Sequence, residues 1–394
     1  MHLYLHVPFC ARRCSYCDFA IAVRRMVPSD RYADAVLREW ALRQDHPGWA
    51  LTSHVETAYF GGGTPSRLNP SAITRILDRI ASLRPIARDA EITLEANPED
   101  VSPVAAGAWR RAGVNRVSLG VQSFDPTVLS WMHRTHTVEQ VPRAVATLRD
   151  AGVTDLSLDL IFGLPAALGR RWDEDLEAAL ALQPTHLSLY GLTVEAGTPL
   201  ARWTERGEVT PVDEERYAAE FLLADAELTR AGYRHYEVSN YARDGARARH
   251  NGAYWRRAPF LGLGPSAHSG WGCDRQWNLR EWTAYETAMR EGLDPIGGGE
   301  TLDDTEVALE ELYLGLRTAD GVSAELVDRG SRESWIGSGW ALEQGGRVCL
   351  TPEGWLRLDA LVGSVRDAGR TPGSRADAWS LAASVFEQQD RVSR

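Results

Sequence analysis

The 394-residue sequence contains no lysine, so all 43 residues counted as lysine or arginine are arginines. A chain without lysine cannot form a lysine Schiff base, anchor pyridoxal phosphate or use the lysine of a phosphate-binding P-loop. Those enzyme classes are therefore excluded. The 54 acidic residues outnumber the arginines and give a net charge of −11. This charge argues against broad nucleic-acid binding, which needs a basic surface.

The sequence also lacks any apolar run of about 18 residues, the length that a membrane-spanning helix needs. We therefore expect no integral membrane segment. The first ten residues, MHLYLHVPFC, have neither the basic region nor the apolar region of a secretory signal peptide. These absences together predict a cytoplasmic protein, in which stable disulfides are rare.

Cysteine is scarce, and three of the five cysteines (Cys10, Cys14 and Cys17) lie within eight residues. Such a cluster is no disulfide framework, and clustered thiols in a cytosolic protein typically bind metal or do redox chemistry. Zinc favours cysteine pairs two residues apart and needs a fourth ligand. The spacing C-x3-C-x2-C suits instead a [4Fe–4S] cluster whose fourth iron stays open. The isolated Cys273 and Cys349 are expected to be structural.

Strand-like apolar segments alternate with helical segments through the first half of the chain. Strands are predicted at His2–Val7, Val55–Phe60, Glu91–Ala96, Arg116–Val121, Asp155–Ile161 and His186–Leu192. Helices are predicted at Asp30–Arg43, Pro70–Leu83, Pro103–Ala112, Val138–Ala151 and Trp172–Leu182. This alternation predicts a parallel sheet with right-handed crossovers. Because a closed TIM barrel needs eight repeats, six repeats predict a partial, open (β/α)6 TIM-like barrel.

The alternation stops near residue 200, and we predict three regions. Residues 1–200 form the barrel, and residues 201–300 form an extension, rich in aromatic residues and glycine, that lies over the barrel mouth. Residues 301–394 form a mostly helical, winged-helix-like domain with a hairpin at Ala341–Leu350. That domain has no basic stripe, so DNA binding is disfavoured.

Polar and glycine-rich motifs follow the later strands in order. They are GGGTP at 61–65, EANP at 95–98, GVQSF at 120–124 and DLIFGLP at 159–165. Together with the cysteine motif after the first strand, this series resembles the radical SAM superfamily. The resemblance implies a [4Fe–4S] cluster on Cys10, Cys14 and Cys17, with S-adenosylmethionine (SAM) bound to the open iron. In that superfamily, one-electron transfer from the cluster can cleave SAM.

A narrower resemblance runs from about residue 3 to residue 360. The segments YLHVPFC, GGGTPS, GVQSFD, DLIFGLP and YEVSNYA resemble the oxygen-independent coproporphyrinogen III oxidase-like family. Arginine pairs well with a carboxylate such as that of SAM, and acidic side chains suit its ammonium and ribose hydroxyls. The resemblance implies that SAM is bound by Tyr4, Tyr16, Gly62, Gly63, Thr64, Glu95, Gln122, Arg134 and Asp159.

Two branches of that family compete. The oxidase branch decarboxylates coproporphyrinogen; it carries a further cysteine two residues after the third ligand and a long N-terminal extension. Here Phe19 occupies that position, and nine residues precede Cys10. The sequence HNGAYW at 250–255 matches the HNxxYW motif of the HemW-type haem chaperone branch. We therefore favour a haem chaperone, with the oxidase or another tetrapyrrole-acting radical SAM enzyme as alternatives.

The resemblance implies a haem site at His250, Asn251, Tyr254 and Trp255. Imidazole is a common axial ligand of haem iron, and aromatic rings can stack on a porphyrin. The flanking arginines could pair with the propionates; they are Arg247, Arg249, Arg256 and Arg257. Alternatively, His250 is a hydrogen-bonded core residue.

Two further histidines are considered. His268 is another candidate haem ligand, and His6 is expected to line the site beside the cluster. The expected partners are haem, haem-accepting proteins and an electron donor such as flavodoxin or ferredoxin. A homo-oligomer is compatible with the sequence.

Overall fold

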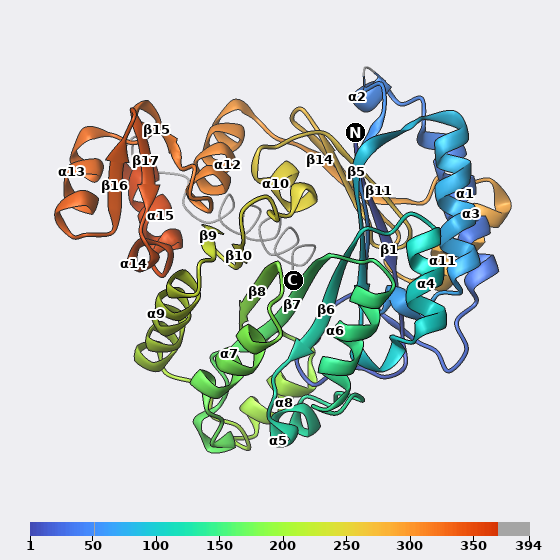
Figure 1. Cartoon of the computed structure of the whole chain (residues 1–394). Helices are drawn as coiled ribbons and strands as arrows, with labels where there is room; N and C mark the ends of the chain where they lie inside the picture. The colour runs from blue at the N-terminus through green and yellow to red at the C-terminus, as the bar shows by residue number, and fades with distance from the viewer. Residues whose placement is uncertain (51, 369–394) are drawn as a thin grey trace.

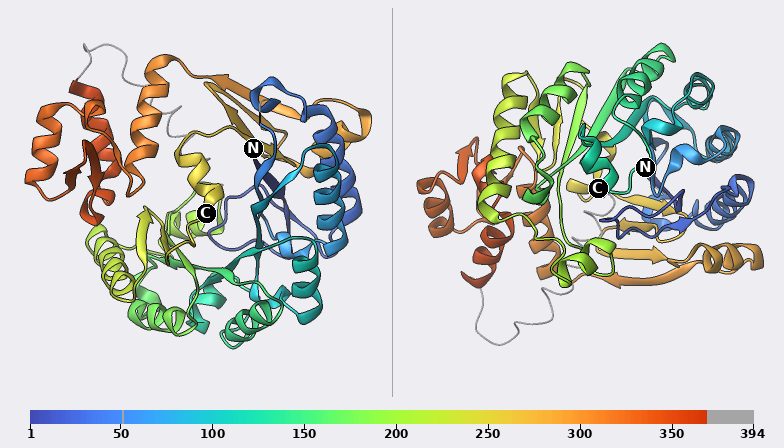
Figure 2. Two further views of the ribbon diagram at one scale, coloured as in Figure 1. Left: turned by 45° about the horizontal axis from the view of Figure 1, so that its top comes forward. Right: turned by 90° about the horizontal axis from the view of Figure 1, so that it is seen from below.

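The computed structural model describes residues 1–50 and 52–368, and its centre is a curved parallel sheet. The 12-stranded sheet has the order β14-β13-β12-β11-β1-β4-β5-β6-β7-β8-β10-β9. Six central strands run parallel: β1 (His2–Val7), β4 (Val55–Gly62), β5 (Ile86–Ala96), β6 (Arg116–Gln122), β7 (Asp155–Phe162) and β8 (His186–Gly191). Figures 1 and 2 show these strands curving into an open barrel, which confirms the predicted fold class.

Helices between the strands cover the outside of the barrel (Figure 2). They are α1 (Ser29–Arg43), α3 (Pro70–Leu83), α4 (Pro103–Arg111), α6 (Gln140–Asp150) and α7 (Trp172–Ala181). Two short helices, α2 (Pro47–Ala50) and α5 (Pro126–Trp131), lie toward opposite ends of the barrel (Figure 1). Helix α3 shows why they form: the Asn69 side chain accepts the Ser71 N–H, and Ile73, Ile76 and Ile80 are buried. The boundaries follow the predicted ones within a few residues, the largest difference being that β5 begins at Ile86.

Residues after the barrel extend both edges of the sheet. Strand β11 (Phe260–Leu263) pairs parallel with β1, and β10 (Asn240–Ala242) pairs antiparallel with β8. The other elements of this region are α8 (Pro199–Glu205), α9 (Glu214–Arg230), β9 (Arg234–Glu237), α10 (Arg249–Trp255), β12 (His268–Trp271), β13 (Asp274–Asn278), α11 (Trp282–Glu291) and β14 (Ile296–Thr301).

Helix α10, which carries the HNGAYW sequence, lies at the end of the barrel where the parallel strands begin. Figure 1 places it near the start of β1, with α5 and α8 at the other end. Its first turn is fixed there because the Glu91 carboxylate of β5 accepts the backbone N–H groups of Arg249 and His250, at 2.8 and 2.9 Å. The expectation that this segment lies over the barrel mouth is therefore corrected for α10.

The C-terminal part combines helices with a small antiparallel sheet. It contains α12 (Asp304–Leu316), β15 (Val322–Ser323), α13 (Arg329–Gly337), β16 (Ala341–Gln344), β17 (Arg347–Leu350), α14 (Pro352–Trp355) and α15 (Leu358–Ala368). The predicted hairpin is present, since β16 and β17 pair across Gly345 and Gly346, both with positive φ. Residues 369–394 of the predicted domain lie outside the described residues.

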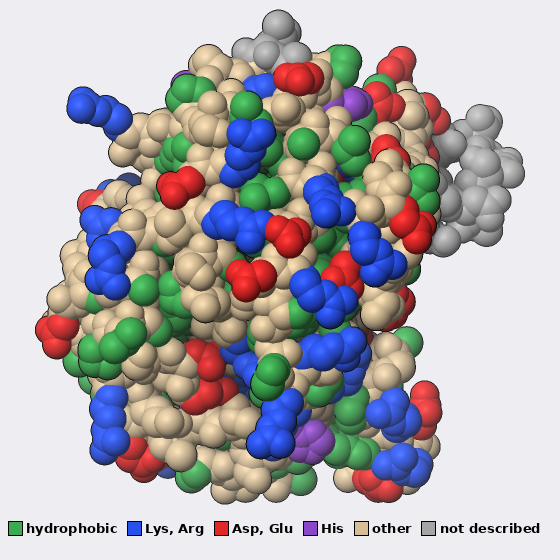
Figure 3. Space-filling model, turned by 90° about the vertical axis from the view of Figure 1, so that its right-hand side faces the viewer, with side chains coloured by type: hydrophobic (Ala, Val, Ile, Leu, Met, Phe, Trp, Pro, Cys, Tyr) green, Lys and Arg blue, Asp and Glu red, His purple; other side chains and the backbone are tan. Residues whose placement is uncertain are grey.

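Within residues 1–50 and 52–368, no helix has the length and apolar character needed to cross a membrane. On the face shown in Figure 3, arginines lie among acidic side chains and scattered apolar groups.

Candidate functional site

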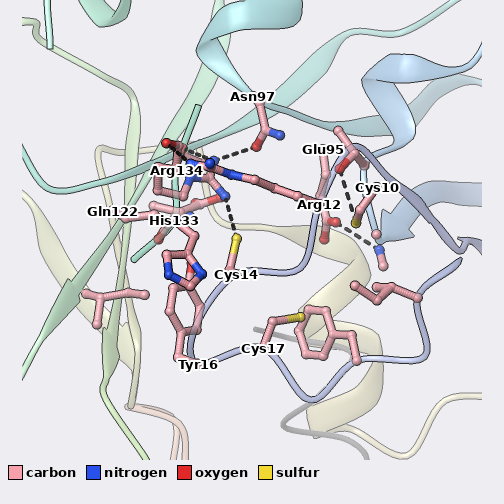
Figure 4. A pocket seen from close by; sticks show the side chains of 18 of the residues that line it. Cys10, Arg12, Cys14, Tyr16, Cys17, Glu95, Asn97, Gln122, His133 and Arg134 are labelled. Carbon is pink, nitrogen blue, oxygen red and sulfur yellow. Dashed lines mark hydrogen bonds between the residues drawn. The ribbon is translucent and has the colours of Figure 1, made fainter. Parts of the chain in front are cut away.

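A cavity of about 360 Å³ opens at the end of the barrel where the parallel strands finish; we call it the cysteine cavity. The loop after β1 brings the three clustered cysteines to its wall (Figure 4). Polar groups at the following strand ends complete the lining. The predicted residues found there are Cys10, Cys14, Cys17, Tyr16, Gly62, Gly63, Thr64, Glu95, Gln122, Arg134 and Asp159.

The three thiols that line the cavity are of the donor type that binds an iron–sulfur cluster. The Thr64 hydroxyl donates to Cys10 Sγ at 3.4 Å, and burial raises the pKa of Cys10 to about 11 and that of Cys17 to about 12. Among the described residues, no three metal-binding side chains gather as a single ion would require. A [4Fe–4S] cluster does not require this, because each thiolate binds a different iron. The donor set therefore fits the cluster.

Arg134 supplies a partly buried positive charge beside these thiols. Its guanidinium donates to Asn97 Oδ1 at 2.6 Å and to the Gly120 carbonyl at 2.8 Å, and it contacts Cys14 Sγ at 3.8 Å (Figure 4). Its buried Nε has no hydrogen-bond partner among the described residues. This residue can therefore stabilise thiolate charge and still bind a carboxylate.

Glu95 is the last residue but one of β5, and its carboxylate is held in place from two sides. Tyr59 donates its hydroxyl to Oε1 at 2.8 Å, and the Gly62 N–H donates to Oε2 at 2.9 Å. Burial raises the pKa of Glu95 to about 7. Gly62 has a φ of +108°, and a Cβ there would lie 2.5 Å from the His6 ring, so only glycine allows this turn.

Two further strand ends carry polar groups into the cavity. Asp159 accepts hydrogen bonds from Ser118 at 2.8 Å and Ser157 at 3.1 Å, although burial still raises its pKa. Gln122 has a φ of 67° and follows a register shift in β6. A non-glycine residue in the left-handed region is strained, and such strain clusters at binding sites.

The structure separates two expected residues from the cysteine cavity. Tyr4 is 2% exposed and does not line the cavity; its hydroxyl bonds His6 Nδ1 at 3.1 Å, and its ring stacks on Tyr59. The expected role of His6 beside the cluster is likewise not seen, because His6 lies behind the Gly62 turn. The sequence analysis did not single out Tyr59, which also lines the cavity. Side chains alternate between the two faces of a strand, so Tyr59 lies on the same face of β4 as Gly61, and this pattern could have revealed it.

The histidine of the HNGAYW sequence is a core residue. His250 is 1% exposed; its Nδ1 bonds Thr57 Oγ1 and its Nε2 bonds the Tyr254 hydroxyl, both at 2.7 Å. Its ring stacks on Tyr59 with centroids 5.1 Å apart, and burial lowers its pKa well below the usual value. Both ring nitrogens are engaged, which agrees with the alternative of a hydrogen-bonded core histidine. Asn251 is also buried.

A second cavity of about 710 Å³ lies at the opposite end of the barrel, against α10, α12 and β15; we call it the arginine cavity. Of the four residues expected to bind haem, only Trp255 lines it. Its other lining side chains include His2, Tyr236 and the arginines Arg247, Arg249, Arg256, Arg257 and Arg347.

Comparison with known proteins assigns the chain to a family. Residues 4–179 match the Radical SAM superfamily. The sequence is 36% identical over 369 residues to the heme chaperone HemW of Mycobacterium tuberculosis (strain ATCC 25618 / H37Rv), covering 91% of this chain and 93% of the relative. The chain belongs to the HemW family. This HemW-family chain is also 38% identical to HemW of Escherichia coli (strain K12), over 68% of its own length and 69% of the relative's.

A mitochondrial relative and a solved structure extend the comparison. The HemW-family chain is 35% identical to the Bos taurus radical S-adenosyl methionine domain-containing protein 1, mitochondrial, covering 82% of this chain and 74% of the relative. The solved coproporphyrinogen III oxidase (HemN) of Escherichia coli superposes with a TM-score of 0.75, 22% identity and coverage of 92% and 88%, which shows a shared fold alone. Membership of the radical SAM superfamily implies a [4Fe–4S] cluster and SAM as cofactors.

Proposed function

We propose that this HemW-family chain is a haem chaperone, which binds haem and transfers it to acceptor proteins while holding a SAM-coordinated [4Fe–4S] cluster. The observation that carries the proposal is the extent of the similarity to heme chaperone HemW of Mycobacterium tuberculosis, which covers 91% of the chain. That similarity extends beyond the barrel, and the HNGAYW helix lies outside the part matched by the superfamily.

In this proposal, the cluster and SAM bind in the cysteine cavity. Cys10, Cys14 and Cys17 bind the cluster, and Arg134 binds the SAM carboxylate through its unpartnered Nε edge. Glu95 accepts a hydrogen bond from the SAM ammonium or a hydroxyl. The other proposed contacts are Tyr16, Gly62, Gly63, Thr64, Gln122 and Asp159. When bound, the reduced cluster and SAM supply one-electron chemistry.

The haem is proposed to bind at the α10 end of the barrel. Trp255 offers an aromatic surface there, and neighbouring arginines offer positive charge for carboxylates. His250, Asn251 and Tyr254 are buried, so their role in this proposal is to hold α10 in place.

An oxidase acting on coproporphyrinogen is the second candidate, because the cysteine cavity contains every predicted SAM residue except Tyr4. Phe19 argues against it. It lines the cysteine cavity at the position where the oxidase motif carries a further cysteine. A radical SAM enzyme acting on another tetrapyrrole is the remaining alternative.

The test reconstitutes the cluster anaerobically, titrates haem by absorbance, and measures haem transfer to an apo-haemoprotein and coproporphyrinogen decarboxylation with SAM and reductant. A chaperone binds haem at micromolar concentration, releases it to the acceptor and leaves coproporphyrinogen intact. Decarboxylation without haem binding would replace the proposal with the oxidase.

We further propose a cytoplasmic location and an electron donor such as flavodoxin or ferredoxin. Reduction of the cluster by either protein, followed spectroscopically, tests the donor. Gel filtration with light scattering, with and without haem, tests for a homo-oligomer.

A further inference from the structure

His2 presents a ring nitrogen at the wall of the arginine cavity. The residue begins β1, is 8% exposed and lines this cavity. Its Nδ1 bonds Thr57 Oγ1 at 3.0 Å on the barrel side. No hydrogen bond joins its Nε2 to a described residue. Because Nε2 lies on the other side of the ring from the Nδ1 bond, it is the nitrogen left for a ligand in the cavity.

A hydrogen-bonded chain behind His2 can fix the tautomer that a metal needs. Thr57 Oγ1 bonds the Nδ1 atoms of both His2 and His250, and His250 Nε2 bonds the Tyr254 hydroxyl. If His2 Nδ1–H donates to Thr57, the Thr57 hydroxyl donates to His250 Nδ1, and His250 Nε2–H donates to Tyr254. Every bond then has one donor, and His2 Nε2 keeps its lone pair. Metal-binding histidines are commonly oriented by such a bond from the other ring nitrogen.

The same cavity holds an aromatic side chain and an unpaired charge. Trp255 is 6% exposed, and its Nε1–H has no hydrogen-bond partner among the described residues. Arg256 makes no ion pair with any described residue. The neighbouring lining arginines are engaged: Arg249 with Asp89, Arg257 with Glu310 and Glu311, Arg247 with Asp320, and Arg347 with the carbonyls of Asp320 and Gly321.

The Arg256 guanidinium is a donor of the kind that binds a carboxylate. Trp255 lines the same cavity and offers an aromatic surface for a flat ligand. A volume of about 710 Å³ is within the range of cavities that hold cofactor-sized ligands. The chemistry of the cavity thus suits a flat apolar molecule with carboxylates at its edge and a metal that accepts imidazole.

We propose that the arginine cavity binds haem with its iron on His2 Nε2, a propionate at Arg256 and the porphyrin against Trp255. His250 is then a positioning residue, which orients His2 through Thr57 and does not itself bind iron. This inference rests on the proposed function, since it specifies how the haem would be held. It differs from the expectation drawn from the sequence, in which the haem site centres on His250.

The test compares haem absorption spectra of the full chain with reconstituted cluster and three histidine variants. His2→Ala is expected to lose the histidine-type Soret band, and added imidazole is expected to restore it by occupying the vacated space. His250→Gln is expected to keep the histidine-type band. His54→Ala, which removes an exposed histidine at the same end of the barrel, is the matched control and leaves the spectrum unchanged.

Thr57→Val removes the Nδ1 partner of His2 and is expected to weaken haem binding about tenfold, the lower end of the usual cost of losing such a partner. Iron content of the cluster, measured in every variant, reports on folding. A histidine-type band that persists in His2→Ala, or a loss that imidazole does not reverse, overturns the inference while wild-type haem binding stands. Absence of haem binding by the wild type overturns the proposed function itself.

Discussion

The two ends of the barrel are built in different ways. The cysteine cavity draws most of its predicted residues from short motifs that each follow a parallel strand, and the sheet brings these motifs together at one end of the barrel. The arginine cavity draws on β1, α10, α12 and the small C-terminal sheet, which are far apart in the sequence. Sites at the carboxyl ends of parallel strands can thus be read from motifs, whereas a site made by packing several elements together cannot.

The largest difference between the two ends should follow from removing a cluster ligand. Cys10→Ser, Cys14→Ser and Cys17→Ser are each expected to lose most of the cluster, because three thiolates are its only protein ligands in our assignment. Iron and sulfide analysis after anaerobic reconstitution measures this. Haem binding at the other end should persist in these variants. Cys273→Ser and Cys349→Ser are the controls, and loss of the cluster in either would refute the ligand assignment.

The second largest effect should be a loss of SAM affinity, with haem binding unchanged. Arg134→Ala and Glu95→Ala each remove a charge-assisted hydrogen bond, worth about 1.5–3 kcal/mol, or roughly ten- to a hundredfold in affinity. The SAM-induced change in the spectrum of the reduced cluster gives the affinity. Arg290→Ala on the exposed side of α11 is the control. Unchanged SAM affinity in both cavity variants would remove these residues from the SAM site.

The complementary change at the arginine cavity should affect haem alone. Trp255→Ala removes an aromatic surface, so we expect haem affinity to fall about tenfold while the iron spectrum changes little. Haem titration followed by absorbance measures both quantities. The cluster content and SAM affinity should equal those of the wild type. If Trp255→Ala also lost the cluster, haem binding and cluster binding would not be independent of each other.

SAM affinity should depend on pH through Glu95. Because burial raises the pKa of Glu95 to about 7, this side chain is mainly a carboxylate at pH 8 and mainly protonated at pH 6. A protonated acid accepts a hydrogen bond from SAM less well, so affinity is expected to fall about tenfold as the pH drops from 8 to 6. Glu95→Gln should give weak binding with a flat profile. An unchanged slope in that variant would assign the pH dependence to another group.

The smallest effect should come from one hydroxyl. Tyr59→Phe removes the hydrogen bond that lowers the pKa of Glu95, so the midpoint of the SAM pH profile should move up by about one unit. Tyr285→Phe is a matched control, because that hydroxyl donates to the buried Glu39 carboxylate outside both cavities. An identical midpoint in Tyr59→Phe and wild type would contradict the proposed role.

The fold could be predicted where periodicity was strong. Strand β1 and helix α3 have the predicted boundaries, because their apolar residues recur with a single period. Strands β12 and β14 were missed. Their sequences, HSGW and IGGGET, are short and glycine-rich, and their pairing with β13 decides their conformation.

The candidate sites divide in the same way. The strand-end motifs located the cysteine cavity, and the structure brings together all the predicted residues except Tyr4 and His6. The HNGAYW sequence indicated the right helix but not the right side chains. Its histidine faces the barrel interior and its tryptophan faces the arginine cavity, a division set by how α10 docks on Glu91.

The stack of Tyr59 on His250 has a thermodynamic consequence. Tyr59 holds Glu95 at the cysteine cavity, and His250 reaches Thr57 and His2 at the arginine cavity, so one chain of contacts joins the two ends. If haem alters the affinity for SAM through this chain, SAM must alter the affinity for haem by the same factor. Binding or loss of SAM at the cysteine cavity would then change how readily haem is released from the arginine cavity.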